Sequence, residues 1–182
     1  VGTQASKSII EDYSKNKQYC LTLEPARKDG SIVCSRRGSG TYTIEVFGKA
    51  AHSGINPQEG INAIEKLSGI TLDLQRLTKK YPGVNINVGL IKGGSTVNTV
   101  PDYASIEVDV RIDQIKQVEV VDKDIRDIVN NNNINKATTK ISGNITRPPM
   151  ELNTQNQNLA NLIVKLGKDL DIEIGAVSTG GG

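Results

Sequence analysis

The order of hydrophobic patterns in the middle of the chain is the feature that most restricts its fold. Four segments alternate apolar and polar residues, which is the pattern of a strand with one buried face. They cover residues 41–47, 84–91, 104–112 and 138–146. Two segments with apolar residues at helical spacing lie among them, at residues 57–80 and 115–128. The order is therefore strand, helix, strand, strand, helix, strand.

This order predicts an α+β fold, a ferredoxin-like βαββαβ sandwich. In that fold the four strands form an antiparallel sheet, and both helices lie on one face of it. The other face stays uncovered, so its polar positions are free for solvent or a partner. We place this unit at residues 38–147. Asn56 is the predicted N-cap of the first helix, because Pro57 and Glu59 follow it at positions typical of a helix start.

The two flanks differ from this unit in pattern. Residues 1–37 predict a helix and then two strands, over residues 5–14, 19–23 and 31–35. Residues 148–182 predict a helix with Thr154 as its N-cap and Gln157 in the capping-box place, and a short strand over 172–177. Neither flank can bury its apolar face alone. We interpret them as fragments of an α/β domain into which the central unit is inserted.

The composition argues against several classes of function. Lys and Arg total 22, Asp and Glu total 20, and the two signs are interspersed, which gives no basic surface for nucleic acid. No apolar run approaches the roughly 18–20 residues that span a membrane. We therefore expect neither a nucleic-acid nor a membrane partner. Cys20 and Cys34 are predicted to be small buried hydrophobic residues, with a disulfide as the alternative.

The chain has a single histidine, His52, in the segment FGKAAHSGINPQEGINAI between the first strand and the first helix. On the residues alone, two interpretations fit. His52 is either a solvated turn residue, or an imidazole that the loop presents to something outside the unit.

Four segments, in this order, resemble the bacterial glutamate carboxypeptidases and, more broadly, the di-zinc exopeptidases, aminoacylases and desuccinylases. They are LEPAR followed by a glycine, RRGSGTYTIEVFGKAAHSGINPQEGINAI, GGSTVNTVPDYASIEVDVRI and STGGG. The resemblance covers essentially the whole chain. It implies that residues 38–147 are the lid, or dimerisation domain, and that residues 1–37 and 148–182 come from the zinc-binding catalytic domain. It also implies that the chain starts just after the family's paired glutamates and stops just before another part of the active site.

The resemblance implies roles for four residues. His52 would donate a hydrogen bond to the oxygen that becomes negative during amide hydrolysis, in the active site of the other subunit. Asn98 and Arg111 would bind the terminal carboxylate and neighbouring carbonyl of the substrate, for which a planar guanidinium is well suited. Glu24 would be a ligand to one zinc ion.

Most of the metal site would lie outside this chain. A two-zinc site needs about five protein ligands and a general base, whereas the chain has one histidine and, in a ligand-like place, Glu24. We therefore expect two zinc ions in each active site of the intact parent, none held by this chain, and no hydrolytic activity of the chain alone.

The sequence thus predicts the lid of a bacterial, homodimeric, carboxypeptidase-like hydrolase. The parent would cleave an amide or peptide bond next to the terminal carboxylate of an acylated amino acid or peptide. The subunits would pair through an exposed sheet edge and a helix. We expect a cytoplasmic parent, with a periplasmic or secreted location left open. The alternative is a stand-alone ferredoxin-like module that dimerises or senses a small ligand without catalysis.

Overall fold

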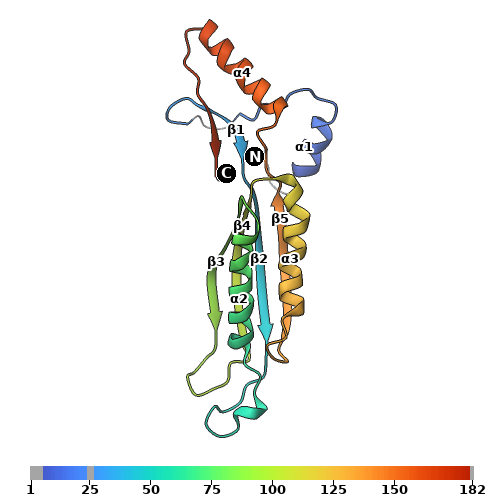
Figure 1. The fold of residues 1–182 in the computed structure, drawn as a ribbon, viewed down its shortest axis with the longest axis vertical. Helices are drawn as coiled ribbons and strands as arrows, with labels where there is room; N and C mark the ends of the chain where they lie inside the picture. The colour runs from blue at the N-terminus through green and yellow to red at the C-terminus, as the bar shows by residue number, and fades with distance from the viewer. Residues whose placement is uncertain (1–5, 24–26, 181–182) are drawn as a thin grey trace. The chain divides into compact units, whose positions relative to one another are not determined.

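The computed structural model describes residues 6–23 and 27–180. The chain divides into two compact units (Figure 1). The larger unit is Arg36–Glu151 with the chain from Thr179 onward, and the smaller unit combines the chain up to Ser35 with Leu152–Ser178.

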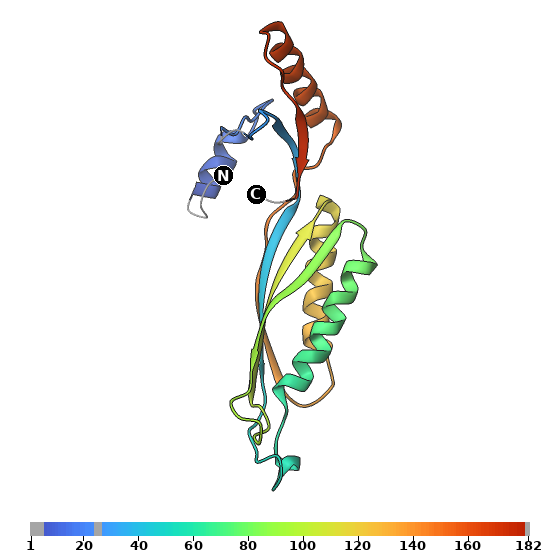
Figure 2. The ribbon, with the colours of Figure 1, turned by 90° about the vertical axis from the view of Figure 1, so that its left-hand side faces the viewer.

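The larger unit is a four-stranded antiparallel sheet with two helices on one face (Figure 2). Its elements in chain order are β2 (Gly38–Phe47), α2 (Ala63–Lys80), β3 (Val84–Gly93), β4 (Tyr103–Ile112), α3 (Val118–Asn131) and β5 (Thr138–Arg147). The spatial order of the strands is β3-β4-β2-β5, and all neighbouring strands are antiparallel. The predicted α+β, ferredoxin-like arrangement is confirmed.

The core lies between the sheet and the two helices. Alternate residues of the central strands are buried there, because side chains along a strand point to opposite faces in turn. The buried set comprises Tyr42, Ile44 and Val46 of β2, Ile106, Val108 and Val110 of β4, Leu67, Ile70 and Leu74 of α2, and Val121 and Ile125 of α3. Each full burial of such a side chain stabilises the fold by roughly 1.5–3 kcal/mol. The opposite face carries the alternate, mostly polar residues, among them Thr43, Glu107 and Arg111.

The first helix of this unit begins later than predicted. Asn56 precedes only the 3₁₀ turn η2 (Pro57–Glu59), after which Gly60 returns to extended backbone. Helix α2 begins at Ala63, and the side chain of Asn62 accepts a hydrogen bond from the main-chain N–H of Glu65. Both asparagines have a glutamate three residues on, so the capping pattern fits either one. The extended Gly60 between them interrupts the helix.

The smaller unit contains α1 (Lys7–Ser14), α4 (Thr154–Asp169) and, except for their last residues, the strands β1 (Ile32–Arg36) and β6 (Ala176–Thr179), which pair with each other. The predicted strand over residues 19–23 was wrong: these residues are exposed and form no strand. The predicted start of α1 at Ala5 lies outside the described residues. The cap of α4 is Asn153, whose side chain accepts from the N–H of Asn156, one residue before the predicted Thr154.

The prediction of two buried cysteines was also wrong. Cys20 is exposed, because the segment around it has no sheet to join. Cys34 lies half-buried in β1 and donates its S–H to the carbonyl of Val177 at 3.3 Å. Both thiols are free, so the alternative of a disulfide does not hold.

A polar network ties α3 to the sheet. The Tyr42 hydroxyl donates to Asp122 Oδ1 at 2.5 Å. Arg126 donates to the same carboxylate at 2.9 and 3.1 Å, and to the Gly143 carbonyl at 2.9 Å. Desolvation raises the pKa of Asp122, but the hydrogen bonds from Arg126 and Tyr42 outweigh it and hold that pKa below its ordinary value. Burial, together with the bond to Asp122, raises the pKa of Tyr42 far above its usual range.

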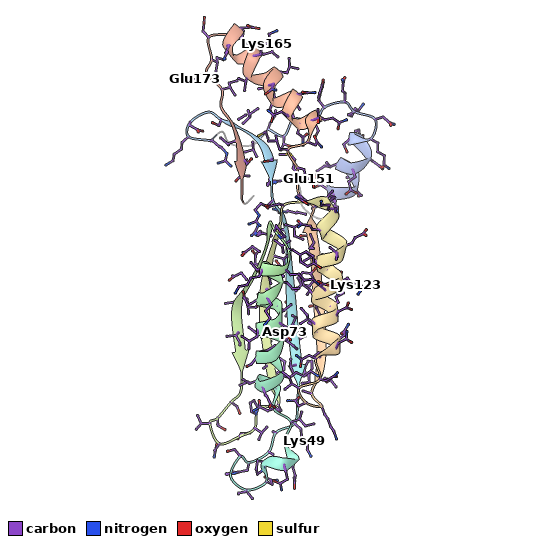
Figure 3. All side chains as sticks on the ribbon, in the orientation of Figure 1. Lys49, Asp73, Lys123, Glu151, Lys165 and Glu173 are labelled. Carbon is purple, nitrogen blue, oxygen red and sulfur yellow. The ribbon has the colours of Figure 1, made fainter. Side chains whose placement is uncertain are left out.

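The loop between β2 and α2 is closed at its base by main-chain pairing. Lys49 and Ile61 exchange two N–H···O hydrogen bonds of 2.9 Å each. Figure 3 labels Lys49 at this end of the larger unit. Gly48 lies against the same backbone: a Cβ there would be 2.0 Å from the carbonyl oxygen of Ile61. The closed loop base therefore requires a glycine.

We predict that Tyr42→Phe lowers the free energy of unfolding by roughly 1.5–3 kcal/mol, the range for a hydrogen bond to a charged group. Tyr103→Phe is the matched control. The Tyr103 hydroxyl bonds to Glu45 at 3.1 Å on the surface, so its loss should change stability by less than about 0.5 kcal/mol. Chemical denaturation of the three proteins measures both values.

The Tyr42 effect should depend on pH. Because the folded-state pKa of Asp122 is depressed, its contribution is fully present above the unfolded value of about 3.9 and is lost as the pH falls through the folded value. The difference between wild type and Tyr42→Phe should therefore shrink below about pH 4. A difference that stays constant into acid would contradict this account.

We predict that Gly48→Ala destabilises the chain by about 1–3 kcal/mol, because backbone atoms must move to admit the methyl group. It should also speed hydrogen exchange at the Ile61 amide. Gly54→Ala, in the same loop, is the control: its Cβ would meet His52 Cε1 at an ordinary 3.6 Å. Equal effects of the two substitutions would argue against a closed loop base.

Candidate functional site

His52 lies on the exposed loop between β2 and α2, and hydrogen bonds hold both its main chain and its ring. The His52 N–H donates to Asn56 Oδ1 at 3.2 Å. The His52 carbonyl accepts from the N–H groups of Ile55 and Asn56, at 3.2 and 3.1 Å. Ring atom Nδ1 accepts from the main-chain N–H of Gly54 at 3.1 Å. The imidazole is therefore exposed to solvent, and its orientation is fixed.

Asn98 lies on the loop between β3 and β4, and the structure brings this loop beside His52. The carbonyl of Asn98 accepts from the N–H of Ser53 at 2.9 Å. His52 and Thr99 form an isolated antiparallel bridge. Both His52 and Asn98 are exposed. Two of the predicted site residues thus share one end of the larger unit, on loops joined through their main chains.

Arg111 lies toward the other end of β4. It is opposite Ser39 in β2 and Asn85 in β3, whereas Tyr103, at the end of β4 nearest the two loops, is opposite Phe47. The distance along the strand from Tyr103 to Arg111 is about 26 Å, at about 3.3 Å per residue. The half-buried guanidinium donates from Nε to Asp109 Oδ2 at 2.9 Å. Within one chain, Arg111 does not meet His52 and Asn98.

The fourth predicted site residue, Glu24, lies outside the described residues. Across residues 6–23 and 27–180, no group of three or more His, Cys, Asp or Glu side chains is placed to hold a metal ion. The described side chains do not form a metal site by themselves, so we derive no chemical step through a metal from them.

An open pocket of about 710 Å³ lies beside the base of the His52 loop. Its lining includes Lys49 and Lys136, but also Glu59 and Glu65. The two signs of charge balance, so the pocket does not select an anion. Neither His52 nor Asn98 lines it. It is therefore separate from the predicted site.

The sequence patterns missed two residues that hold His52 in place. Gly54 contributes only its main-chain N–H, and Asn56 joins the N–H of His52 to the carboxylate of Glu59. The available signal was the preference of asparagine for bonds to nearby main-chain groups in turns. The same pattern, with Pro57 and Glu59 after it, instead predicts Asn56 as a helix cap.

In the described part of the chain, no helix has both the length and the apolar character needed to cross a membrane.

Comparison with known proteins gives consistent matches. Carboxypeptidase G2 of Pseudomonas sp. (strain RS-16) is 24% identical over 183 residues, which cover 100% of this chain and 44% of that protein. An uncharacterized metallohydrolase of Methanocaldococcus jannaschii is 35% identical over 109 residues, 55% of this chain and 30% of that protein. The chain thus spans less than half the length of these relatives.

Solved structures show the same fold. A tripeptidase from Staphylococcus aureus matches with a TM-score of 0.72 and 19% identity, over 88% of this chain and 42% of that chain. Aminopeptidase PepT from Bacillus cereus also matches with a TM-score of 0.72, at 17% identity, over 98% of this chain and 49% of that chain.

The family model of the M20 peptidase dimerisation domain matches residues 34–137. This match covers more than half of the chain and includes β2, α2, β3, β4 and α3. The resemblance read from the sequence motifs is confirmed: this chain belongs to the M20 peptidase dimerisation-domain family.

Proposed function

We propose that the larger unit is the lid of a homodimeric, zinc-dependent, carboxypeptidase-like hydrolase, and that it presents His52 and Asn98 to the active site of the partner subunit. Residues 1–37 and 148–182 then belong to the parent's catalytic domain, where Glu24 is a ligand to one of the two zinc ions. Family membership and a relative named carboxypeptidase support this proposal. The observation that carries it is the position of His52 and Asn98, held together at one end of the unit.

The proposed chemistry follows from the side chains. The His52 imidazole N–H is a donor for an oxygen that gains negative charge during amide hydrolysis, and the Asn98 amide binds the carbonyl next to the substrate carboxylate. Removal of one such donor typically lowers turnover by about 10²–10³-fold. The Arg111 guanidinium binds the terminal carboxylate of the substrate through two parallel hydrogen bonds. The substrate class is therefore an acylated amino acid or a peptide with a free carboxylate.

The distance within one chain determines how these groups can cooperate. Arg111 lies about 26 Å along β4 from the end that carries the two loops. The reacting amide and the carboxylate of such a substrate are only a few bonds apart. One substrate can therefore contact all three side chains only if His52 and Asn98 come from one subunit and Arg111 comes from the other.

The strand β3 provides the surface best suited to pairing. Both β3 and β5 are edge strands, but exposed β5 positions are mainly polar, whereas β3 exposes Leu90 and Ile91. The first half of the β3 edge is already occupied by α2. Thr78 bonds to the N–H of Ile86 at 3.0 Å, and Gln75, with its amide nitrogen facing Ile86, bonds to the Ile86 carbonyl and the Val88 N–H.

The second half of the edge remains open. In the described part of the chain, no side chain bonds to the backbone of Leu90 or Ile91. An open, apolar edge is a template for another strand. We therefore assign subunit pairing to β3 from Leu90 onward, together with the exposed Leu72 of the adjoining α2.

The shared site predicts complementation between inactive variants of the intact parent protein. His52→Ala should lose about 10²–10³-fold in turnover, and Arg111→Ala should lose activity because the substrate carboxylate then has no guanidinium partner. After subunit exchange in an equal mixture, half of the dimers are mixed, and each mixed dimer has one site with neither substitution. Activity should return to about a quarter of wild type, as expected for a twofold-symmetric dimer.

A mixture of His52→Ala with Asn98→Ala is the control. Both residues come from the same subunit, so every site in the mixed dimer lacks one of them and no activity should return. Recovery in this control, or none in the first mixture, would contradict the shared site. Full activity of His52→Ala would show that His52 is not the proposed donor.

We predict that Ile91→Lys weakens self-association of the chain by at least about tenfold, since a lysine on an edge strand opposes pairing. Ser142→Lys, on the exposed β5 edge, is the matched control and should leave the dimer intact. Sedimentation equilibrium measures both. Dissociation by Ser142→Lys alone would instead assign the interface to β5.

A further inference from the structure

The ring of His52 is fixed by a hydrogen bond within its own loop. Atom Nδ1 lies 3.1 Å from the main-chain nitrogen of Gly54, whose N–H donates to it. A neutral imidazole carries its proton on one nitrogen and accepts at the other. The nitrogen that accepts from Gly54 cannot be the protonated one, so the proton is on Nε2.

We propose that the main-chain N–H of Gly54 holds neutral His52 as the Nε2–H tautomer, which makes Gly54 a positioning residue for the donor. This inference rests on the proposed function only for its catalytic meaning, because the tautomer itself is a property of the loop. In the described part of the chain, no group is bonded to Nε2. The ring therefore presents one available N–H, in a set direction, outside the loop.

The rest of the turn supports this arrangement. Asn56 Oδ1 accepts from the N–H of His52 at 3.2 Å, and Asn56 Nδ2 donates to Glu59 Oε2 at 3.0 Å. These bonds fix the main chain on both sides of Gly54. The second nitrogen of a histidine commonly sets the tautomer through a side-chain or carbonyl partner. Here the partner is a main-chain donor two residues away, and it selects the tautomer by donating.

The role of Gly54 is separable from its small size. A Cβ at this position would meet His52 Cε1 and Nδ1 at 3.6 and 3.7 Å, which are ordinary contacts. Alanine therefore fits and keeps the N–H. Proline lacks the N–H. Gly54→Ala and Gly54→Pro thus form a matched pair that separates the donor from the side-chain volume.

The test is nitrogen NMR of the full chain, in which the single histidine gives one unambiguous set of ring signals. At alkaline pH, two-bond ¹H–¹⁵N correlations report how the proton divides between Nδ1 and Nε2. Wild type and Gly54→Ala should show the Nε2–H tautomer in clear excess over the same chain unfolded in urea. A scalar coupling between the Gly54 amide nitrogen and His52 Nδ1 should be visible in both folded proteins.

Gly54→Pro should return the ring to the tautomer mixture of the unfolded chain. If this variant keeps the wild-type mixture, Gly54 does not set the tautomer and the inference is wrong. The substitution could also open the loop, which would be seen as loss of exchange protection at the Ile61 amide. In that case the test is the scalar coupling between the Gly54 amide nitrogen and His52 Nδ1 in the wild type. Its absence, or a wild-type mixture equal to that of the unfolded chain, overturns the inference.

These results are independent of turnover. A fixed Nε2–H tautomer, combined with full activity of His52→Ala in the intact protein, would leave the positioning correct and the proposed function wrong. A mixed tautomer, combined with successful complementation, would leave the proposed function correct and the positioning role of Gly54 wrong.

Discussion

The antiparallel pairing of β2 with β4 is the constraint on which the rest of this structure depends. The register runs without a shift from Gly38 opposite Ile112 to Phe47 opposite Tyr103. It sends alternate side chains of both strands into the core and leaves polar residues on the open face. It also fixes which loops meet, because the chain leaves β2 and enters β4 at the same end. The bridge between His52 and Thr99 continues this pairing beyond the sheet.

The regular elements of this unit could be predicted because each has its own hydrophobic period. Tyr42, Ile44 and Val46 alternate, and the apolar residues of α2 recur at helical spacing, so both patterns are set by burial against one core. The start of α2 was not predictable in the same way. Asn56 and Asn62 present the same local capping pattern, and only the path of the chain through Gly60 separates them. Residues 19–23 show the opposite error: their apolar content predicts a strand, but a strand also needs a neighbour to bond to, which no local pattern reveals.

The candidate site could be predicted by motif but not by arrangement. The sequence identifies His52, Asn98 and Arg111 as residue types suited to donate hydrogen bonds or bind a carboxylate. It does not show that Ser53 bonds to the Asn98 carbonyl, because that contact joins two loops distant in sequence through main-chain atoms that every residue possesses. The bond from Gly54 to the ring of His52 is local, but it too is invisible in the sequence because its donor is a main-chain N–H. Main-chain contacts carry no side-chain signature, so they appear only in coordinates.

The length of β4 links the proposed catalysis to dimerisation. A strand that holds Arg111 near one end and leads to the His52 and Asn98 loops at the other separates these groups by more than one small substrate can span. No side-chain rotation in one chain removes that separation, since the sheet between them is rigidly hydrogen-bonded on both sides of β4. The distribution of edge contacts agrees with this. Helix α2 occupies the half of the β3 edge that lies toward Arg111 and leaves open the half that lies toward the His52 loop. In the proposed enzyme, therefore, pairing of subunits is a geometric requirement for assembling the site, and the domain that pairs them also carries the donors.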